Sequence, residues 1–291
     1  MIRTLGLFAA IFLTACQTGS GVSEQEAQQA AASAALAASL AAQPEEVRAR
    51  YDERHPQATI EYFGIQPGMT VAEALPGGGW YTKILLQYLG EEGTLLGADY
   101  PVSLYSNFGF MTPERLKAKE TWVTDWPAGA REWGVSNGAA VDGFVLGDLP
   151  ETMQGSADVV LFVRALHNMA RFSGNVDYLG QAIADAHAVL KPGGIAGVVQ
   201  HQGAEEMSDE WASGKNGYLK KSFVIAQFEA NGFELLGDSD INSNAKDQPT
   251  ADDFVWRLPP SLRTSSDNPE LMEALKAVGE SNRMTLKFRK N

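Results

Sequence analysis

The chain has 291 residues, of which 44% are hydrophobic and 20% charged, and this suits one large or two small soluble globular domains. Its formal net charge of -13 argues against a nucleic-acid substrate, because an acidic surface repels phosphate backbones; the same charge also serves solubility. Cys16 is the only cysteine, which excludes an internal disulfide and a cysteine-based metal site.

Residues 1–15 have the pattern of an export signal. Arg3 supplies a positive charge, and Leu5–Leu13 is an apolar run too short to span a bilayer in the mature protein. The small residues before Cys16 resemble the lipobox of bacterial lipoproteins, and this resemblance implies that Cys16 is lipidated. Gln17 follows, which by analogy with lipoprotein sorting favours the outer membrane. We therefore expect a chain lipid-anchored on the periplasmic side of the cell envelope. An ordinary signal peptide, or a short buried helix with a chance cysteine, is the alternative.

Residues 16–43 are expected to form the lipidated cysteine and a tether. Thr18–Gln43 consists mostly of Ala, Gln, Ser and Gly, and such a segment buries too little surface to offset its ordering entropy. Alanine favours transient helix over Glu26–Ala42, but we expect low order there. The folded domain is expected to occupy residues 44–291.

Folding signals begin with a helix from Pro44 that ends near His55, because the residue before Pro56 disfavours helical geometry. A short helix over Ala58–Phe63 follows, and apolar runs then alternate with helical patterns. The expected strands are Thr70–Leu75, Thr94–Ala98, Gly143–Leu146, Asp158–Val163, Ile195–Val199, Phe233–Leu236 and Met284–Phe288. The expected helices are Trp80–Leu89, Val176–Leu190 and Phe223–Ala230. This alternation predicts an α/β fold with a mostly parallel central sheet and helices on both faces.

The segment Tyr100–Ala140 is expected to be irregular. It contains three tryptophans, Trp122, Trp126 and Trp133. They indicate either a lid over a site or packing of an irregular segment onto the core.

A glycine-rich turn follows the first expected strand. Pro76, Gly77, Gly78 and Gly79 separate this strand from the helix that begins at Trp80. Glycines let the backbone turn tightly and approach a ligand closely. In open α/β sheets ligands bind beyond the carboxyl ends of the strands, so this turn predicts the binding site.

From Pro67 to Phe288 the order of these features resembles the class I S-adenosylmethionine (SAM) methyltransferases, which have a Rossmann-like fold. The resemblance implies SAM as cofactor. It implies that Glu73, Pro76 and Gly77–Gly79 shape the methionine end of its pocket. It also implies that Asp99 accepts hydrogen bonds from the ribose and that Asp148 faces the adenine amino group. Acidic residues that merely cap strand ends are the alternative for both aspartates.

A closer resemblance is to bacterial proteins described as predicted methyltransferases, which are often exported. It rests on Arg54-His55-Pro56, the Pro-Gly-Gly-Gly-Trp-Tyr-Thr run 76–82, His167-Asn168 and His201. Leu75 departs from the pattern, since methyltransferases usually have glycine there. A leucine adds bulk near the methionine moiety of the cofactor.

Four side chains are candidates for chemistry. His167 and Asn168 follow the fourth expected strand, His201 ends the fifth, and Tyr81 lies in the first turn of the glycine-loop helix. Histidine suits proton transfer near neutral pH, and Asn168 suits orienting a nucleophile. Loop hydrogen bonding or strand capping would account for the same residues without catalysis. No metal site is expected.

Two functions remain open from the sequence. The first is a SAM-dependent methyltransferase that acts on a small molecule. The second is a non-catalytic envelope lipoprotein that uses the same fold to bind a ligand or partner. SAM is made in the cytoplasm, so the export signal favours the second function, as does Leu75, whereas Glu73, Asp99 and the three glycines favour the first.

Overall fold

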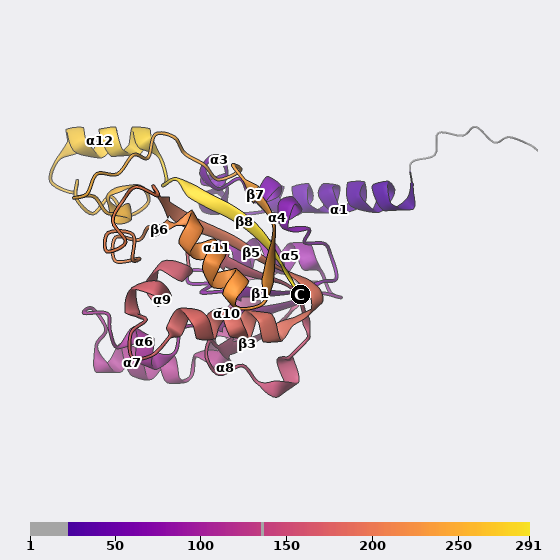
Figure 1. Cartoon of the computed structure of the whole chain (residues 1–291). Helices are drawn as coiled ribbons and strands as arrows, with labels where there is room; N and C mark the ends of the chain where they lie inside the picture. The colour runs from indigo at the N-terminus through magenta and orange to yellow at the C-terminus, as the bar shows by residue number, and fades with distance from the viewer. Residues whose placement is uncertain (1–22, 135–136) are drawn as a thin grey trace, which may run out of the picture.

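A computed structural model describes residues 23–134 and 137–291, and its strands form one central sheet with helices on both faces (Figure 1). The strands are β1 (Thr70–Ala74), β2 (Thr94–Asp99), β3 (Ala140–Val145), β4 (Ala157–Val163), β5 (Leu190–Gly203), β6 (Leu219–Lys220), β7 (Phe233–Ser239) and β8 (Arg283–Lys290). The predicted fold class is confirmed.

The strand order is β3-β2-β1-β4-β5-β8-β7, with the short β6 paired to the end of β5. Strands β1 to β5 are parallel to one another, and β8 runs antiparallel to both of its neighbours, β5 and β7. The chain moves outward from β1 to β3 and then returns to β4 on the other side of β1. The strand order therefore reverses beside β1, which places the binding crevice at the carboxyl ends of β1 and β4.

The helices form two layers around this sheet. Along the chain they are α1 (Glu24–Ala41), α2 (Glu45–Arg48), α3 (Tyr51–Arg54), α4 (Pro56–Phe63), α5 (Trp80–Leu89), α6 (Val102–Tyr105), α7 (Pro113–Glu120), α8 (Trp122–Trp133), α9 (Leu166–Phe172), α10 (Tyr178–Val189), α11 (Lys221–Ala230) and α12 (Pro269–Val278). Two single 3₁₀ turns lie at Glu151–Met153 and Val255–Arg257. One buried cluster joins α1, α4, α5 and α8 to one face of the sheet, and a second joins α9, α10 and α11 to the other. Alternate residues of β1 serve the two clusters, Val71 the first and Ala72 the second.

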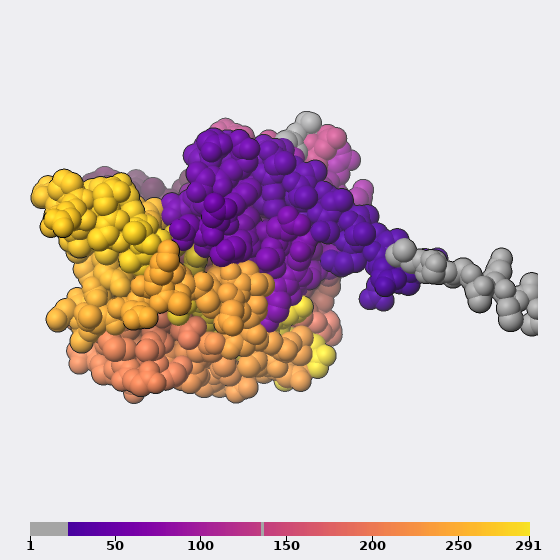
Figure 2. Space-filling view, turned by 90° about the horizontal axis from the view of Figure 1, so that it is seen from above, coloured from indigo at the N-terminus to yellow at the C-terminus, as the bar shows by residue number. Residues whose placement is uncertain are grey.

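The low order expected for residues 18–43 is wrong for the described part of that segment. Helix α1 begins with a capping box in which Ser23 and Glu26 bond reciprocally. Its second half buries Leu36 and Leu40 against the core, and Gln43 donates to the carbonyl of Lys83. Figure 2 shows these first helices, in indigo and violet, lying against the body of the molecule. Two leucines at helical spacing thus order a segment whose composition alone indicated a tether.

The irregular structure expected between Tyr100 and Ala140 is also wrong, because α6, α7 and α8 lie there. Trp122 and Trp126 stack with ring centroids 5.2 Å apart and pack against Gly97 and Gly143, where the sheet has no side chains. The packing role of these two tryptophans is therefore confirmed. Helix α7 also reaches the end of β2, where its Lys119 donates a hydrogen bond to Asp99.

Boundaries differ elsewhere by a few residues. Strand β3 begins at Ala140 rather than Gly143, and helix α10 begins after Asp177, whose side chain accepts from the Gly180 amide. Strand β5 begins at Leu190, with a bulge across Lys191–Gly194 before regular pairing resumes at Ile195. The single helix expected between Pro44 and His55 is interrupted near Arg50 and forms the short α2 and α3.

Candidate functional site

The turn after β1 combines three left-handed residues within five positions. Leu75, Gly77 and Gly79 have φ angles of 55°, 54° and 74°. The Leu75 amide still donates to the Ala98 carbonyl at 2.7 Å, so the turn begins while β1 is paired to β2. A left-handed conformation is natural for glycine and costs about 1–3 kcal/mol for other residues. A glycine would adopt this conformation at position 75 without strain. This chain has leucine there, so the turn is strained at Leu75.

The glycines of the turn have different surroundings. A Cβ atom at Gly79 would lie 2.2 Å from the Trp133 ring, so the close approach of α8 requires glycine there. A Cβ atom at Gly78 would meet nothing within 4 Å, and its backbone is not left-handed. Gly78 therefore faces open space next to Gly77, which lines the loop hollow, and Pro76 is buried.

Glu73 is buried at the end of β1 and accepts a hydrogen bond from the Thr82 hydroxyl at 2.6 Å. Burial raises the pKa of Glu73 to about 7, against the opposing effect of the Thr82 hydrogen bonds. Thr82 belongs to the first turn of α5. Glu73 thus ties the strand to the helix on either side of the glycine turn and lines neither of the two hollows described below.

Asp99 ends β2 with both carboxylate oxygens occupied. The Tyr105 hydroxyl donates to Oδ1 at 2.7 Å, and the Lys119 ammonium donates to Oδ2 at 2.7 Å. Burial and the charge of Asp99 both raise the pKa of Tyr105, so its hydroxyl keeps its proton. Asp99 is buried, and these two contacts satisfy it from α6 and α7.

Two hollows flank Asp99. The loop hollow, of about 440 Å³, lies between the glycine turn, the segment after β2 and helix α9, and its lining includes Leu75, Gly77, Tyr105, His167 and Asn168. The edge hollow, of about 320 Å³, lies at the ends of β2 and β3, and its lining includes Tyr100, Lys119, Val145 and Asp148. Tyr105 lines one hollow and Lys119 the other. The two residues that hold Asp99 therefore stand between two parts of one crevice, and both hollows fall within the usual size of ligand sites.

Asp148 is exposed, and its backbone is held by a hydrogen bond from its amide to the Val145 carbonyl at 3.0 Å. It lines the edge hollow, which is the part of the crevice farther from the glycine turn.

The structure brings His167, in α9 just after β4, together with His201 near the end of β5. Their ring centroids are 5.5 Å apart, and Ser281 Oγ lies 2.5 Å from His201 Nδ1. Burial lowers the pKa of His167 to about 4, partly offset by a hydrogen bond to Gln200. Burial, His167 and Arg164 lower the pKa of His201 well below its usual value. Both rings are therefore neutral at pH 7.

The contact with Gln200 favours one tautomer of His167. The Gln200 amide nitrogen donates to the Gly217 carbonyl at 3.0 Å and lies 3.5 Å from His167 Nδ1. An amide nitrogen only donates, so this contact favours the tautomer in which Nδ1 accepts and Nε2 carries the proton. In that tautomer His167, which lines the loop hollow, can donate a hydrogen bond from Nε2.

The two remaining candidate residues, Asn168 and Tyr81, differ in whether they line the loop hollow. Asn168 lines the loop hollow, and its Oδ1 is buried without a partner among the described residues. Tyr81 lines neither hollow; it packs edge-on against Trp80, and burial raises its pKa, opposed by Arg283 and Arg54. The arginines that act on Tyr81 also act on His201, but nothing in the contacts of Tyr81 assigns it to catalysis.

Sequence reasoning missed most of an arginine cluster behind the histidines. Arg54 was noted, and its guanidinium lies 4.6 Å from the Trp80 ring and donates to buried Glu280 at 3.0 Å. Arg164 directly follows β4 and Arg283 begins β8, both far along the chain from Arg54, and no local sequence pattern indicated them. Three arginines and one glutamate at unrelated positions give no spacing signal.

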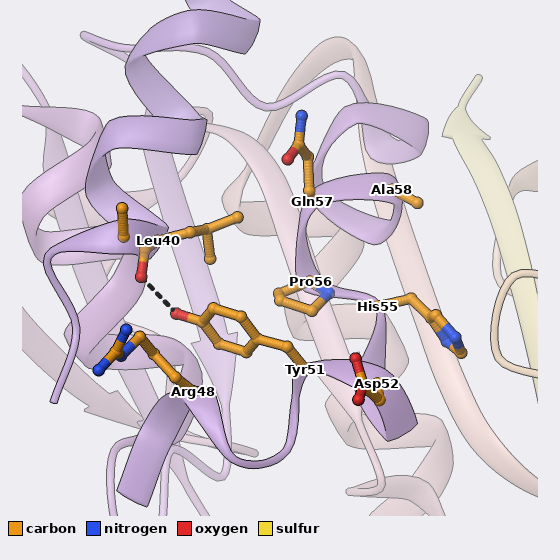
Figure 3. A pocket seen from close by; sticks show the side chains of 9 residues that line it. Leu40, Arg48, Tyr51, Asp52, His55, Pro56, Gln57 and Ala58 are labelled. Carbon is orange, nitrogen blue, oxygen red and sulfur yellow. Dashed lines mark hydrogen bonds between the residues drawn. The ribbon is translucent and has the colours of Figure 1, made fainter. Parts of the chain in front are cut away.

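A still larger hollow, of about 640 Å³, lies between the end of α1 and the turn from α3 to α4 (Figure 3). The Tyr51 hydroxyl donates to the Leu40 carbonyl across it at 2.9 Å, while the exposed His55 ring points away from Tyr51. No strand end or glycine turn contributes to it, so it is a weaker candidate than the crevice. Cys16 lies outside the described residues.

Within residues 23–134 and 137–291, no cluster of three or more His, Cys, Asp or Glu side chains is arranged to hold a metal ion. In the same residues no helix has the length and hydropathy needed to cross a membrane.

No known family model matches the chain, and no curated protein matches it. Solved structures do resemble it. The [4+2]-cyclase SpnF is 19% identical with a TM-score of 0.51, over 82% of this chain and 80% of that one. A SAM-dependent methyltransferase from Aquifex aeolicus is 15% identical with a TM-score of 0.44, over 69% of this chain and 93% of that one.

A methyltransferase from Burkholderia thailandensis, bound to 1,6-didemethyltoxoflavin and S-adenosylhomocysteine, is 12% identical with a TM-score of 0.43, over 96% and 98% of the two chains. At such identities a likeness shows the fold alone. Strand order and the likeness to SpnF together establish the Rossmann-like fold.

Proposed function

We propose that this chain binds SAM along the crevice and transfers its methyl group to a small-molecule acceptor. One observation carries the proposal: the glycine turn, Asp99 and Asp148 follow three adjacent parallel strands and meet at one edge of the sheet. Two hollows of ligand size lie along that edge, on either side of Asp99.

The residues present fit the cofactor in three places. Gly77 would lie beside the methionine moiety, Asp99 would accept hydrogen bonds from the two ribose hydroxyls, and Asp148 would face the adenine. Tyr105 and Lys119 already donate to Asp99, which supports its role as an acceptor of two donors. Leu75 fits less well, because its side chain lines the loop hollow where a glycine would leave room.

When bound, SAM supplies an electrophilic methyl group on a sulfonium sulfur. The chain itself positions the acceptor beside it. His167, with its proton on Nε2, orients an acceptor oxygen or nitrogen by donating a hydrogen bond, and the unpartnered Asn168 Oδ1 accepts one. A histidine whose pKa is about 4 is a weak base, so we assign His167 an orienting role in place of proton abstraction.

Calorimetry of the full-length chain with SAM and S-adenosylhomocysteine tests the proposal. We expect saturable binding by the wild type and its loss in Gly78→Leu. The leucine side chain would extend into open space at the glycine turn, next to Gly77 of the loop hollow, and the free protein tolerates it because nothing lies within 4 Å of the new Cβ atom. An absence of heat with the wild type at millimolar cofactor would leave a non-catalytic lipoprotein as the better description.

We further propose that the chain belongs with the exported bacterial predicted methyltransferases and is lipid-anchored at Cys16 on the periplasmic side of the envelope, in the outer membrane. The run 76–82 and the segment Arg3–Cys16 support this. Helix α1 begins eight residues after Cys16 (24 − 16 = 8), so the anchor would hold the folded domain close to the membrane.

A further inference from the structure

Glu280 is the centre of a buried group of charges beyond the ends of β4 and β5. It is 3% exposed and accepts hydrogen bonds from Arg54 at 3.0 Å and Arg283 at 3.0 Å, as well as from Arg50. Its backbone amide donates to the carboxylate of Glu53. The carboxylate of Glu280 is thus fully engaged by three arginines.

Arg164 is a fourth arginine beside this group, and it has no counter-ion. In residues 23–134 and 137–291 its guanidinium makes no ion pair, and its Nε atom is buried without a hydrogen-bond partner. It nevertheless feels the charges of Glu280 and Arg283. Four guanidinium groups therefore face two carboxylates, Glu53 and Glu280, which leaves a surplus of two positive charges in a chain whose net charge is -13.

The backbone of Arg164 is also strained. It is the first residue after β4 and has a φ of 58°, in the left-handed region that arginine rarely adopts. Such strain costs about 1–3 kcal/mol and is found mainly where function requires a particular side-chain direction. The fold thus places a partly buried charge, which has no ion pair among the described residues, at an unfavourable backbone position.

Arg164 lines a small cavity of about 100 Å³, which we call the arginine pocket, together with His201, Trp256, Ser261, Glu280 and Ser281. The Ser261 hydroxyl and the Arg164 guanidinium are donors suited to an oxyanion, whereas Ser281 already bonds His201. Trp256 also lines the loop hollow, and its ring centroid lies 5.8 Å from that of His167. The arginine pocket therefore adjoins the place where the proposed methyl transfer occurs.

We propose that Arg164 binds a carboxylate of the methyl acceptor, so that the enzyme acts on small carboxylic acids. A carboxylate matches the planar fork of an arginine and fits a cavity with room for about three water-sized groups. Glu280 in the same wall disfavours a dianion such as phosphate. The identification of the bound carboxylate as part of the methyl acceptor rests on the proposed function. In this arrangement the acceptor lies along Trp256, and its reacting atom is near His167 and Gly77.

Binding of acetate, followed by NMR titration of carbon-13-labelled acetate with the full-length chain, tests the inference. We expect millimolar affinity in the wild type, a loss of at least about tenfold in Arg164→Met, and partial recovery in Arg164→Lys. Arg289→Met is the matched control, because it removes the same charge from an exposed pair with Glu234 and should bind acetate as the wild type does. Ethylammonium, a cation of similar size, should not bind.

A thermal melt of Arg164→Met separates binding from folding. Arg164 makes no ion pair among the described residues and is partly buried, so its loss should leave the melting temperature equal or higher, and reduced acetate binding would not reflect unfolding. Acetate binding that is equal in wild type and Arg164→Met would overturn the inference.

A tenfold loss of S-adenosylhomocysteine affinity in Arg164→Met would also overturn it, because Arg164 would then hold the carboxylate of the cofactor. Failure of S-adenosylhomocysteine to bind the wild type would instead overturn the proposed function. Acetate binding that depends on Arg164 would still support a carboxylate site in that case.

Discussion

Replacing Lys119 with methionine should tighten the binding of S-adenosylhomocysteine. In the free protein Lys119 Nζ lies 2.7 Å from Asp99 Oδ2, and the two side chains are 26% and 3% exposed. A ribose hydroxyl can bond that oxygen only after the lysine leaves. A hydrogen bond between charged groups contributes about 1.5–3 kcal/mol, so its loss in the free state should raise affinity roughly tenfold to hundredfold.

Calorimetry with S-adenosylhomocysteine measures this change. Lys117→Met, on the exposed face of the same helix, removes an equal charge without touching Asp99 and should leave the affinity unchanged. The free Lys119→Met protein should melt at a lower temperature, because Asp99 keeps only the Tyr105 hydrogen bond. Unchanged affinity would refute competition for Asp99, and weaker affinity would show that Lys119 contacts the ligand itself.

Three further changes test the fold, the buried acid and the anchor. Gly79→Ala should lower the free energy of unfolding, measured in urea, by on the order of 2–4 kcal/mol, because the backbone there is left-handed and the new methyl group meets Trp133. Gly78→Ala should change it by less than about 0.5 kcal/mol. Equal effects of the two substitutions would contradict the described turn. Between its usual pKa of 4.5 and its folded value of about 7, Glu73 holds a proton in the folded state that the unfolded chain has released, so stability should fall as pH rises. Urea unfolding at pH 5 and pH 8 should show that Glu73→Gln removes up to about 3 kcal/mol of this fall, and parallel pH profiles would contradict the assignment. Radiolabelled palmitate should enter the wild type and not Cys16→Ala, and labelling of both would refute the anchor at Cys16.

Local signals predicted the elements that build the crevice. The apolar run at Thr70–Ala74, the glycine turn and the helix at Trp80–Leu89 have the expected bounds within one residue. Strand period, turn chemistry and helix period all agree over this stretch, so no distant contact was needed to specify it.

Helices α1 and α8 were missed because tertiary packing decides them. Leu36 of α1 and Trp126 of α8 are stabilised by contacts with core residues distant in sequence, and the surrounding composition gives little sign of a buried face. Pro127 inside α8 is a further local signal against helix that packing overrides.

The site was predicted in outline and not in its contacts. Position at strand ends indicated Asp99, His167 and His201, since parallel strands present their carboxyl ends at one edge. The lysine on Asp99 and the unpaired Arg164 depend on side-chain directions from separate elements, which no spacing in the sequence encodes. The low pKa of His167 likewise depends on burial, which changed its assignment from base to orienting donor.

A crystal structure of the full-length chain soaked with S-adenosylhomocysteine tests the central claim most directly. We expect the ribose hydroxyls to lie within hydrogen-bond distance of the Asp99 carboxylate, the adenine to lie in the edge hollow beside Asp148, and Lys119 to have left Asp99. A ligand bound elsewhere, or Asp99 still held by both Tyr105 and Lys119 with the ligand present, would contradict it.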